Sequence, residues 1–405
     1  MIFLYIAECL SVKMKMSNIR RVLLLIVAAF ITFYFYYGHL FTAYKLNSDM
    51  PSLTQWFKLG NRNTESETTV MCFNFNSMQF ANESTVKIIG KLDVTKRYAV
   101  YSTTTENENA MTFIFLLPLT ALTWTRVGFS SVVMVVGSAD TWNANPLLRF
   151  VLTSLLQLNS IVIFLHPKAK NSVMISQMSR IYAASILQSA LPVKYHRSFS
   201  RVYLISSDAD LWPISKDYVL QPGKLILSLN SECCGDFKHG NSSYRMRPMS
   251  NIGMQVSTWL EVTPQFDDWR NSINHIIRYC LLQFGPEALL PVIKGENVGW
   301  FMDQRTISIL LARWEQKNSR NESVRYVPRN TRLDRIDRSN WNVQNSSLDT
   351  IFDAHLLLDG HTNPDSWSQL NHLLLLMLGD TSFGYQWAMH YYVRFQQLRA
   401  NDTQY

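Results

Sequence analysis

The sequence has little charge and lacks the features that identify zinc-finger and nucleic-acid-binding proteins. Only 17% of its 405 residues are charged, and no block of five or more like charges occurs. No Cys-x-x-Cys pair or Cys/His cluster indicates zinc, and no internal repeat is visible. Nucleic acid is therefore not expected as a partner. The net charge of +8 fits a membrane surface or an anionic ligand instead, and 47% apolar residues are enough for a packed core.

Cysteines are few, and sequons for N-glycosylation are present. Four cysteines follow residue 41, namely Cys72, Cys233, Cys234 and Cys280. One or two disulfides are expected in an oxidising compartment, but the pairing cannot be read; the adjacent Cys233 and Cys234 are expected to pair elsewhere or stay free. Sequons occur at Asn82, Asn241, Asn321, Asn345 and Asn401. They permit a lumenal location without establishing it.

The N-terminal region contains one long apolar run. Residues 22–37 carry no charge and no proline, and the run extends to residue 41. About 20 apolar residues suffice to cross a bilayer. Cations precede the run at Lys13, Lys15, Arg20 and Arg21. Because positive residues stay cytosolic, a type II signal-anchor is predicted. A cleaved signal peptide is disfavoured, since no small-residue cleavage site follows.

This anchor predicts a simple domain order. We expect a cytosolic tail at 1–21, a transmembrane helix at 22–41, a polar stem at 42–68 and a lumenal domain at 69–405. Within the lumenal domain, a nucleotide-binding half is expected at about 96–213 and an acceptor half at about 214–395.

After the stem, apolar strands alternate with helical patterns. Strands are predicted at 98–102, 131–136, 161–165 and 202–205, and helices at 113–124, 147–156 and 172–187. Continuous apolar strands separated by helices are typical of a buried parallel sheet, so the predicted fold class is α/β with a Rossmann-type, mostly parallel sheet flanked by helices. Residues 111–124 are predicted to be a buried core helix rather than a second span, because the run is short and contains Pro118.

Two carboxylates follow the fourth predicted strand. The segment runs Tyr203 to Pro213 (YLISSDADLWP) and places Asp208 and Asp210 one residue apart. In open α/β sheets, ligands bind at the carboxyl ends of the strands. A loop with this spacing can direct both carboxylates at one Mg²⁺ or Mn²⁺ ion, which would neutralise a departing diphosphate. In isolation, the same spacing also fits a solvated turn.

In this context, the segment resembles the metal-binding Asp-x-Asp motif of the GT-A glycosyltransferases. The resemblance implies a nucleotide-sugar donor, with a UDP-sugar favoured, and a Mn²⁺ or Mg²⁺ cofactor held by Asp208 and Asp210. It also implies that Tyr101 and Ser102, at the end of a strand, lie beside the nucleotide base. Asp208 is placed near the ribose as well.

Later blocks follow the order that this resemblance implies. Asn251 and Gly253, in Ser250–Met254, are similar to an Asn-x-Gly loop that faces the donor or acceptor sugar. Asp303 and Gln304 open a helix and look like the Asp-Gln block near the acceptor in glycogenin-like transferases; a capping role for Asp303 is the alternative. A later histidine often completes the metal shell, and His355 is favoured over His361. The histidine spacing departs from the glycogenin-like pattern. The order of blocks favours retention of configuration.

Other residues have weaker assignments. The stripe from Trp269 to Phe284 is expected to be core. Four arginines recur every third residue, at Arg329, Arg332, Arg335 and Arg338. A solvated face paired with Asp334 and Asp337 is favoured for them over a grip on a diphosphate or an anionic acceptor. For an inverting reaction, the candidates for a general base are Asp303, Asp236 and Glu232.

The predicted function is transfer of a sugar from a nucleotide donor to a glycan, glycoprotein or glycolipid acceptor, in the Golgi membrane. The main alternative is a lumenal binding protein with a transferase-like fold and no activity. A phosphohydrolase of the haloacid dehalogenase type is a third class, but its Asp-x-Asp follows the first strand of the sheet rather than the fourth.

Overall fold

The described residues all belong to one of two structural units. The computed structural model divides the chain into Met1–Ser52 and Leu53–Tyr405. The structure describes residues 72–77, 85–105, 110–166, 171–230, 234–266, 268–290, 298–318, 324–327, 335–341, 343 and 348–401. The predicted tail, anchor and stem therefore lie outside the described residues. Within those residues, no helix is long and apolar enough to cross a membrane.

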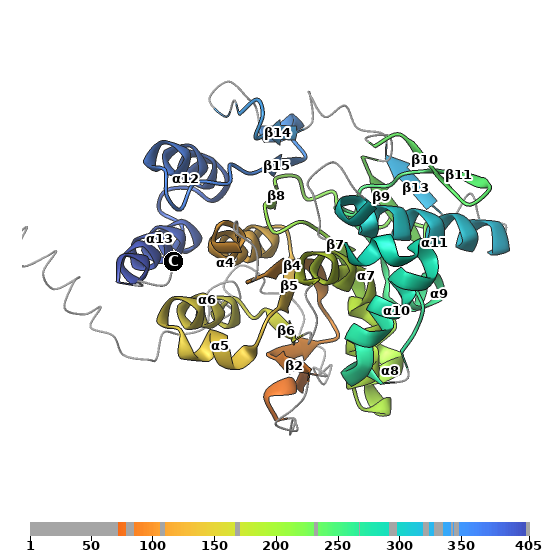
Figure 1. The fold of residues 1–405 in the computed structure, drawn as a ribbon. Helices are drawn as coiled ribbons and strands as arrows, with labels where there is room; N and C mark the ends of the chain where they lie inside the picture. Colours follow the sequence, from red (N-terminus) through yellow and green to blue (C-terminus); the bar gives the residue numbers. More distant parts are fainter. Residues whose placement is uncertain are drawn as a thin grey trace, which may run out of the picture. The chain divides into compact units, whose positions relative to one another are not determined.

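A mixed sheet forms the centre of the second unit (Figure 1). Eight described strands take the spatial order β13-β9-β12-β7-β4-β5-β6-β2. β2 and β12 run antiparallel to their neighbours, and the other strands share one direction. The strands are β2 (Val86–Ile89), β4 (Arg97–Thr104), β5 (Phe129–Val136), β6 (Ile161–Leu165), β7 (Tyr203–Ser206), β9 (Ile226–Leu229), β12 (Ile252–Gln255) and β13 (Val324–Val327). The predicted mostly parallel α/β sheet is confirmed.

Both faces of the central strands are buried. Tyr101 and Val133 join one hydrophobic core, whereas Val100 and Val132 join a second core on the opposite face. Every residue of β5 is buried. Successive side chains of a strand point to opposite faces, so a strand covered on both sides must be apolar throughout. This is why the continuous apolar runs predicted a parallel sheet correctly.

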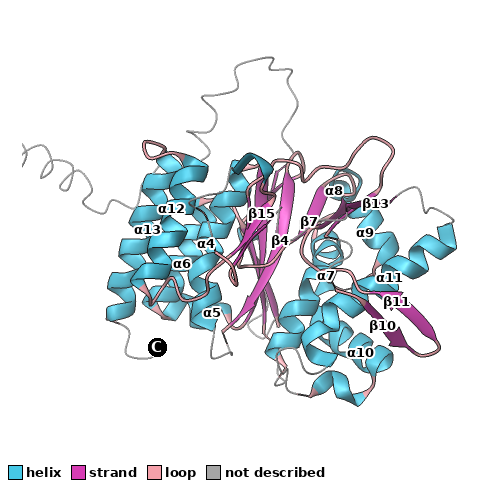
Figure 2. Ribbon diagram, turned by 90° about the horizontal axis from the view of Figure 1, so that it is seen from above, coloured by secondary structure: helices cyan, strands magenta, loops and turns pink. Residues whose placement is uncertain are grey.

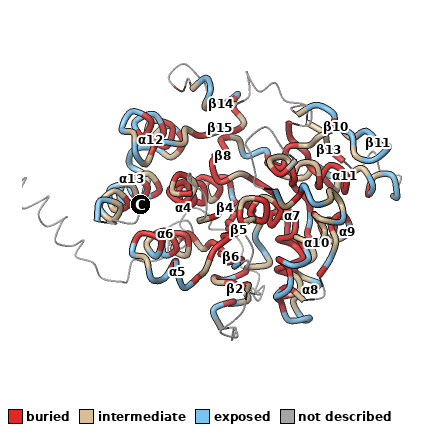
Figure 3. The backbone as a smooth tube through the Cα atoms, viewed as in Figure 1, coloured by how far each residue is buried: buried red, intermediate tan, exposed pale blue. Residues whose placement is uncertain are grey.

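Helices cover the sheet on both sides, as Figure 2 shows. On the Tyr101 face lie α4 (Ala110–Arg126), α5 (Ala139–Ala144), α6 (Pro146–Gln157), α12 (Pro364–Leu378) and α13 (Phe383–Ala400). On the Val100 face lie α7 (Ser172–Ala190), α8 (Val193–Phe199), α9 (Val256–Val262), α10 (Ser272–Phe284) and α11 (Met302–Asn318). The buried residues concentrate on the strands and on the helix sides that face them (Figure 3).

The three helices predicted in the first half of the domain correspond to α4, α6 and α7. The side chain of Asn145 accepts hydrogen bonds from the first turn of α6, and Pro146 occupies a position where a missing N–H costs nothing. Nearly all of α4 is buried in the core of the unit. The prediction that residues 111–124 form a core helix is confirmed, and so is the apolar stripe of α10.

A second, small sheet stands beside the end of β7. Its order is β14-β15-β8, with β8 (Leu211–Pro213) antiparallel to β15 (Asp353–His355) and β15 parallel to β14 (Arg335–Asp337). The register places His355 opposite Leu211. Two antiparallel pairs complete the strands, β1 (Cys72–Asn74) with β3 (Lys91–Asp93), and β10 (Asp236–His239) with β11 (Ser242–Arg245).

Two sequence predictions can be settled or refined at this level. Ser250–Met254 is not a ligand-facing loop, because β12 begins at Ile252 and Gly253 pairs with Ile205 inside the sheet. The cysteines differ from one another: Cys234 is disulfide-bonded, whereas Cys72 and Cys280 are free thiols.

Candidate functional site

The strand order reverses between β4 and β7. The chain moves from β4 to β5 to β6 on one side, then crosses back to place β7 on the other side of β4. The carboxyl ends of β4 and β7 are therefore adjacent, and a crevice is expected where their connections diverge. Asp208 and Asp210 follow β7 at this point, between β7 and β8. Because three parallel strands precede β7 along the chain, the haloacid dehalogenase alternative does not fit.

Asp208 is held by an arginine from α7. The guanidinium of Arg180 contacts the carboxylates of both Asp208 and Asp303, and its Nη1 also donates to the carbonyl of Ser207 (2.8 Å). We call Arg180, Asp208 and Asp303 the Asp208 cluster. The arginine side chain is 7% exposed and that of Asp208 is 33% exposed. The cluster therefore buries its cation and turns a carboxylate towards solvent.

Electrostatics bind the Asp208 cluster together. Burial alone lowers the pKa of Arg180, but the neighbouring Asp208 and Asp303 carboxylates outweigh it and raise that pKa. Burial raises the pKa of Asp303, and Arg180 opposes the rise. The backbone N–H of Gln304 donates to Asp303 Oδ1 (2.7 Å). Asp303 is thus fixed at the start of α11 as the second anion of Arg180, with its side chain 3% exposed.

Asp210 is held by the small sheet. Arg338 contacts both the Asp210 carboxylate and His355 Nε2. His355 Nε2 lies 3.6 Å from Asp210 Oδ2, and His355 Nδ1 lies 3.3 Å from Asp337 Oδ2. We call Asp210, Asp337, Arg338 and His355 the Asp210 cluster. The Asp210 side chain is 9% exposed and that of Arg338 is 25% exposed. Within the Asp210–Arg338 pair the carboxylate is buried and the cation is turned towards solvent, whereas Asp337 is 33% exposed beside His355.

The charges of the Asp210 cluster shift one another. Burial alone raises the pKa of Asp210, but His355 and Arg338 outweigh it and hold that pKa well below its usual range. Burial also lowers the pKa of His355, yet hydrogen bonds to Asp210 and Asp337 raise it to about 9. The hydrogen bond from His355 is the largest cause of the lowered pKa of Asp337. The two carboxylates therefore favour the protonated imidazole, and the charge of Arg338 opposes them.

A buried network joins the two sheets behind these clusters. Asn251 has no exposed surface, and its Nδ2 donates to Asp353 Oδ2 (3.0 Å). Arg335 holds the same carboxylate through Nε (2.7 Å) and Nη2 (3.1 Å). The backbone of Asn251 has a φ of +69°, a conformation that asparagine tolerates better than most residues. Its N–H donates to the carbonyl of Ser206 (2.6 Å), so the network fixes the end of β7.

The predicted metal ligands do not fit a divalent ion in this arrangement. Asp210 and His355 converge, but Nη2 of Arg338 contacts both of them. Asp208 is turned instead to Arg180. Among the described residues, no group of three or more His, Cys, Asp or Glu side chains could hold a metal ion. The structure thus brings together two of the three predicted ligands and places a guanidinium at the point where they meet.

Other predicted site residues are buried in the packing of the sheet. Tyr101 is fully buried on the α4 side, where its hydroxyl donates to the carbonyl of Leu117 (3.2 Å) and burial raises its pKa. The position of Gly253 faces Tyr203, whose hydroxyl oxygen would lie 1.8 Å from an added Cβ. The structure corrects both assignments, because close packing explains these two residues. The assignment of Asn251 is corrected as well, because its side chain is buried in the network with Asp353.

Ser102, His361 and Asp236 have different outcomes. Ser102 is partly exposed and lies two residues beyond Val100, whose carbonyl accepts a hydrogen bond from Ser207 N–H (2.7 Å); it stays beside the Asp208 cluster. His361 lies against Phe115, with ring centroids 6.0 Å apart, and belongs to neither cluster. Asp236 is on β10, where it pairs with Arg245 (2.8 Å). Glu232 lies outside the described residues.

Sequence reasoning missed the cations. Arg180 is the sole charged residue of the 19-residue helix α7, a signal that was available in the sequence. Arg335 and Arg338 were expected on a solvated face, and this is wrong: Arg335 binds buried Asp353 and Arg338 binds Asp210. Arg329 and Arg332 lie outside the described residues. The regular spacing of the four arginines did not show which of them bind buried carboxylates.

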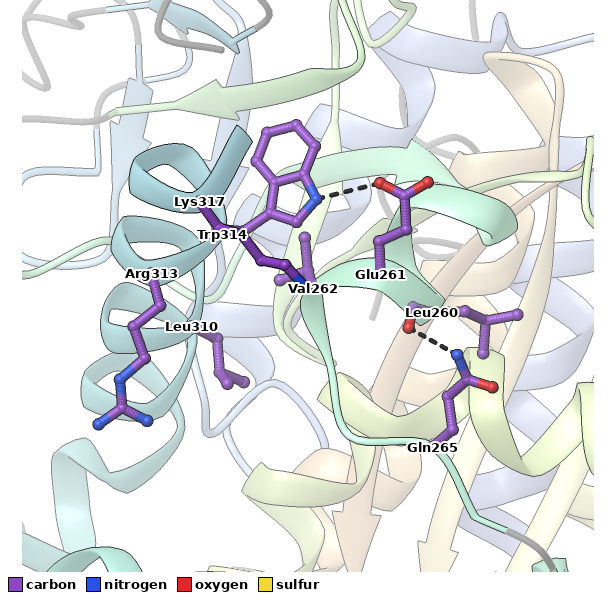
Figure 4. A pocket seen from close by; sticks show the side chains of 8 residues that line it. All are labelled: Leu260, Glu261, Val262, Gln265, Leu310, Arg313, Trp314 and Lys317. Carbon is purple, nitrogen blue, oxygen red and sulfur yellow. Dashed lines mark hydrogen bonds between the residues drawn. The ribbon is translucent and has the colours of Figure 1, made fainter. Parts of the chain in front are cut away.

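A separate cavity of about 540 Å³ lies between α9 and the later turns of α11 (Figure 4). It is lined by Leu260, Glu261, Val262, Gln265, Leu310, Arg313, Trp314 and Lys317. Trp314 Nε1 donates to Glu261 Oε2 (3.2 Å) across it. None of these residues belongs to either cluster, and we assign the candidate site to the end of β7 because buried charges converge there.

Comparisons with known proteins give limited information. No protein-family model matches the sequence, and no curated protein matches it. Among solved structures, the chain is similar to the galactosyltransferase LgtC in complex with donor and acceptor sugar analogs, at 11% identity and a TM-score of 0.32, over 76% of this chain and 97% of that one.

Two further structures are similar at the same level. One is a glycosyltransferase involved in glycosylation of the major capsid of PBCV-1 (8% identity, TM-score 0.29, 68% and 98% covered). The other is the glycosyltransferase GlyE of Streptococcus pneumoniae TIGR4 (8% identity, TM-score 0.29, 74% and 64% covered). Similarity this low carries no argument for activity, so a function can be assigned only from the residues of the site.

Proposed function

We propose that this chain is a glycosyltransferase that moves a sugar from a nucleotide-sugar donor, with a UDP-sugar favoured, to a glycan, glycoprotein or glycolipid acceptor. One observation carries the proposal. Two carboxylates one residue apart lie at the carboxyl edge of the sheet where the strand order reverses, and each is bound by its own buried or half-buried cation. This edge is where α/β sheets bind nucleotides.

The two clusters suit different parts of such a donor. The exposed carboxylate of Asp208 can accept hydrogen bonds from ribose or sugar hydroxyls, with Ser102 beside it. In the Asp210 cluster, the partly exposed guanidinium of Arg338 presents a positive charge, which suits the diphosphate. In the reaction, the bond from the anomeric carbon to the diphosphate breaks, an acceptor oxygen bonds to that carbon, and the acceptor hydroxyl loses its proton. Stabilising the charge on the leaving diphosphate is the main task of the protein.

Asp303 and Gln304 have different roles in this proposal. Asp303 positions Arg180, and through it Asp208. Gln304 is partly exposed, although its Oε1 is buried without a partner among the described residues. We assign the exposed part of this side chain to contact with the donor sugar or the acceptor. Mn²⁺ or Mg²⁺ at Asp210 and His355 would require Arg338 to move first.

The cellular location is part of the proposal. The uncharged run at 22–41 and the cations before it support a type II anchor in the Golgi membrane, with the catalytic domain in the lumen. The five sequons are compatible with that side of the membrane.

The direct test is release of nucleoside diphosphate from UDP-glucose, UDP-galactose, UDP-N-acetylglucosamine and GDP-mannose by the purified full-length chain, with a panel of glycan and glycoprotein acceptors present. We expect release from at least one donor and a loss of about 10- to 100-fold in Asp208→Asn, the size of one lost hydrogen bond to a charged group. Arg278→Gln, an exposed arginine on α10, is the matched control. Nucleotide binding without any release would contradict the enzyme and favour the inactive binding protein.

A further inference from the structure

Arg338 stands where two predicted metal ligands meet. Asp210 Oδ2 and His355 Nε2 are 3.6 Å apart, and Nη2 of Arg338 contacts both. Divalent ions in proteins lie about 2.0–2.2 Å from carboxylate oxygens and imidazole nitrogens. Two donor atoms 3.6 Å apart are therefore close enough to share one ion, and here they share one guanidinium nitrogen.

The third predicted ligand is engaged elsewhere. Asp208 is bound to Arg180, which is itself fixed by Asp303 and by the carbonyl of Ser207. Freeing Asp208 to bind an ion at Asp210 would leave a buried guanidinium with one anion fewer, and uncompensated buried charge is costly. The structure thus separates the two carboxylates of the motif and assigns each a different arginine.

Part of the Arg338 side chain is open to solvent. Nη2 is occupied by Asp210 and His355 and Nε is buried, so an incoming anion can reach only the remaining, exposed part of the side chain. A quarter of the side chain is exposed. Arginine presents five N–H donors in a planar fork that matches phosphate oxygens, and its charge does not depend on a bound ion. An anion that reaches this cluster meets the guanidinium before it meets the buried Asp210, and the more exposed Asp337 is paired with His355.

We infer that Arg338 is the resident cation of the donor site and that the chain binds the diphosphate of its donor without a divalent ion. The inference rests on the proposed function, because it assigns the diphosphate to the Asp210 cluster. The small sheet then has a definite role. β14 and β15 carry Asp337 and His355, and this pair orients the guanidinium against Asp210.

Calorimetric titration of the purified full-length chain with UDP and with GDP tests this inference. Each titration is run with EDTA and again with Mn²⁺, on the wild type, Arg338→Gln, Arg338→Lys and the control Arg278→Gln. We expect the wild type to bind one nucleotide with the same dissociation constant in both buffers. In EDTA, Arg338→Gln should raise that constant about 10- to 100-fold, the loss of one charge-assisted contact.

The variants give further outcomes. Arg338→Lys keeps the charge but not the fork, so its loss of affinity should be smaller than that of Arg338→Gln. Removing the guanidinium also frees Asp210 and His355, so Mn²⁺ should restore part of the affinity of Arg338→Gln. Equal affinity of Arg338→Gln and wild type in EDTA would overturn the inference.

The wild-type titrations need no variant to fold, and they separate two failures. Binding that requires Mn²⁺ in the wild type would overturn the inference and leave the proposed glycosyltransferase standing. No binding of either nucleotide in either buffer, by a chain that unfolds cooperatively, would contradict the proposed function and the inference together.

Discussion

The two carboxylates of the Asp-x-Asp segment lie one residue apart but in opposite surroundings. Asp208 is 33% exposed against an Arg180 that is 7% exposed, whereas Asp210 is 9% exposed against an Arg338 that is 25% exposed. One pair presents an anion to solvent and the other presents a cation. The two carboxylates of one short motif can thus belong to sites with different ligand preferences, hydroxyls at Asp208 and phosphate at Asp210. This is possible because elements far apart in the chain supply their counterions.

The largest expected loss of stability comes from a substitution that disrupts the Asp208 cluster. Arg180→Ala leaves Asp303 buried without its cation, and removing one partner of a buried ion pair costs about 3–5 kcal/mol. Urea unfolding, read from the midpoint at constant slope, measures the loss. The double variant Arg180→Met, Asp303→Leu should recover much of it, since apolar pairs replace buried ion pairs well. A loss below about 1 kcal/mol in Arg180→Ala would mean that the pair is not buried as described.

The next largest effect tests the packing role of Gly253. In Gly253→Ala the new methyl group would meet the hydroxyl of Tyr203, and overpacking of this kind costs about 1–3 kcal/mol. Tyr203→Phe in the same chain should recover part of the loss, because the hydroxyl is the nearest atom. Unfolding in urea measures both. A stable Gly253→Ala chain with reduced nucleotide affinity would instead restore the ligand-facing role that the sequence suggested.

A smaller effect concerns pH and the Asp210 cluster. The pKa of His355 is raised to about 9 from its ordinary value of 6.5, so its protonated form stabilises the fold. That contribution is complete below pH 6.5 and is lost as the pH rises through about 9. Unfolding free energies measured from about pH 6 to about pH 10 should fall more in the wild type than in His355→Gln. Parallel curves for the two chains would show that Asp210 and Asp337 do not hold a charged imidazole.

The smallest expected effect on stability is that of Asp208→Asn. Its carboxylate is partly exposed, and such ion pairs contribute about 0–1 kcal/mol. The variant should therefore unfold almost like the wild type while losing turnover. Loss of stability as large as in Arg180→Ala would show that Asp208 is mainly structural.

The sequence predicted the sheet better than the site. A strand that is apolar throughout, such as Ile161–Leu165, must be covered on both faces. Its sequence pattern therefore predicts a central position in a sheet flanked by helices. The position of Asp208 and Asp210 followed from the strand before them. His355 was also expected beside Asp210, and it lies there. The contact of Arg338 with Asp210 was not expected, because it depends on β14 and β15, and strands of three residues carry too little pattern to predict.

The errors within the site have the same origin. Tyr101 was expected at the end of a strand, but it lies inside β4 and points to the α4 face because side chains alternate along that strand. Gly253 was assigned to a ligand because glycine permits close approach; it permits the approach of Tyr203 instead. The face to which a side chain points depends on the tertiary structure, whereas a sequence motif specifies only the residue types.

Thermal unfolding of the full-length chain with UDP, GDP or CMP, beside the Asp208→Asn variant, tests the central claim most directly. A nucleotide at about 100 times its dissociation constant stabilises by about 2.7 kcal/mol, a shift of a few degrees in Tm. We predict such a shift with one nucleotide in the wild type and a much smaller shift in Asp208→Asn. No shift with any of the three, from a chain that unfolds cooperatively, would contradict a nucleotide-sugar site at the end of β7.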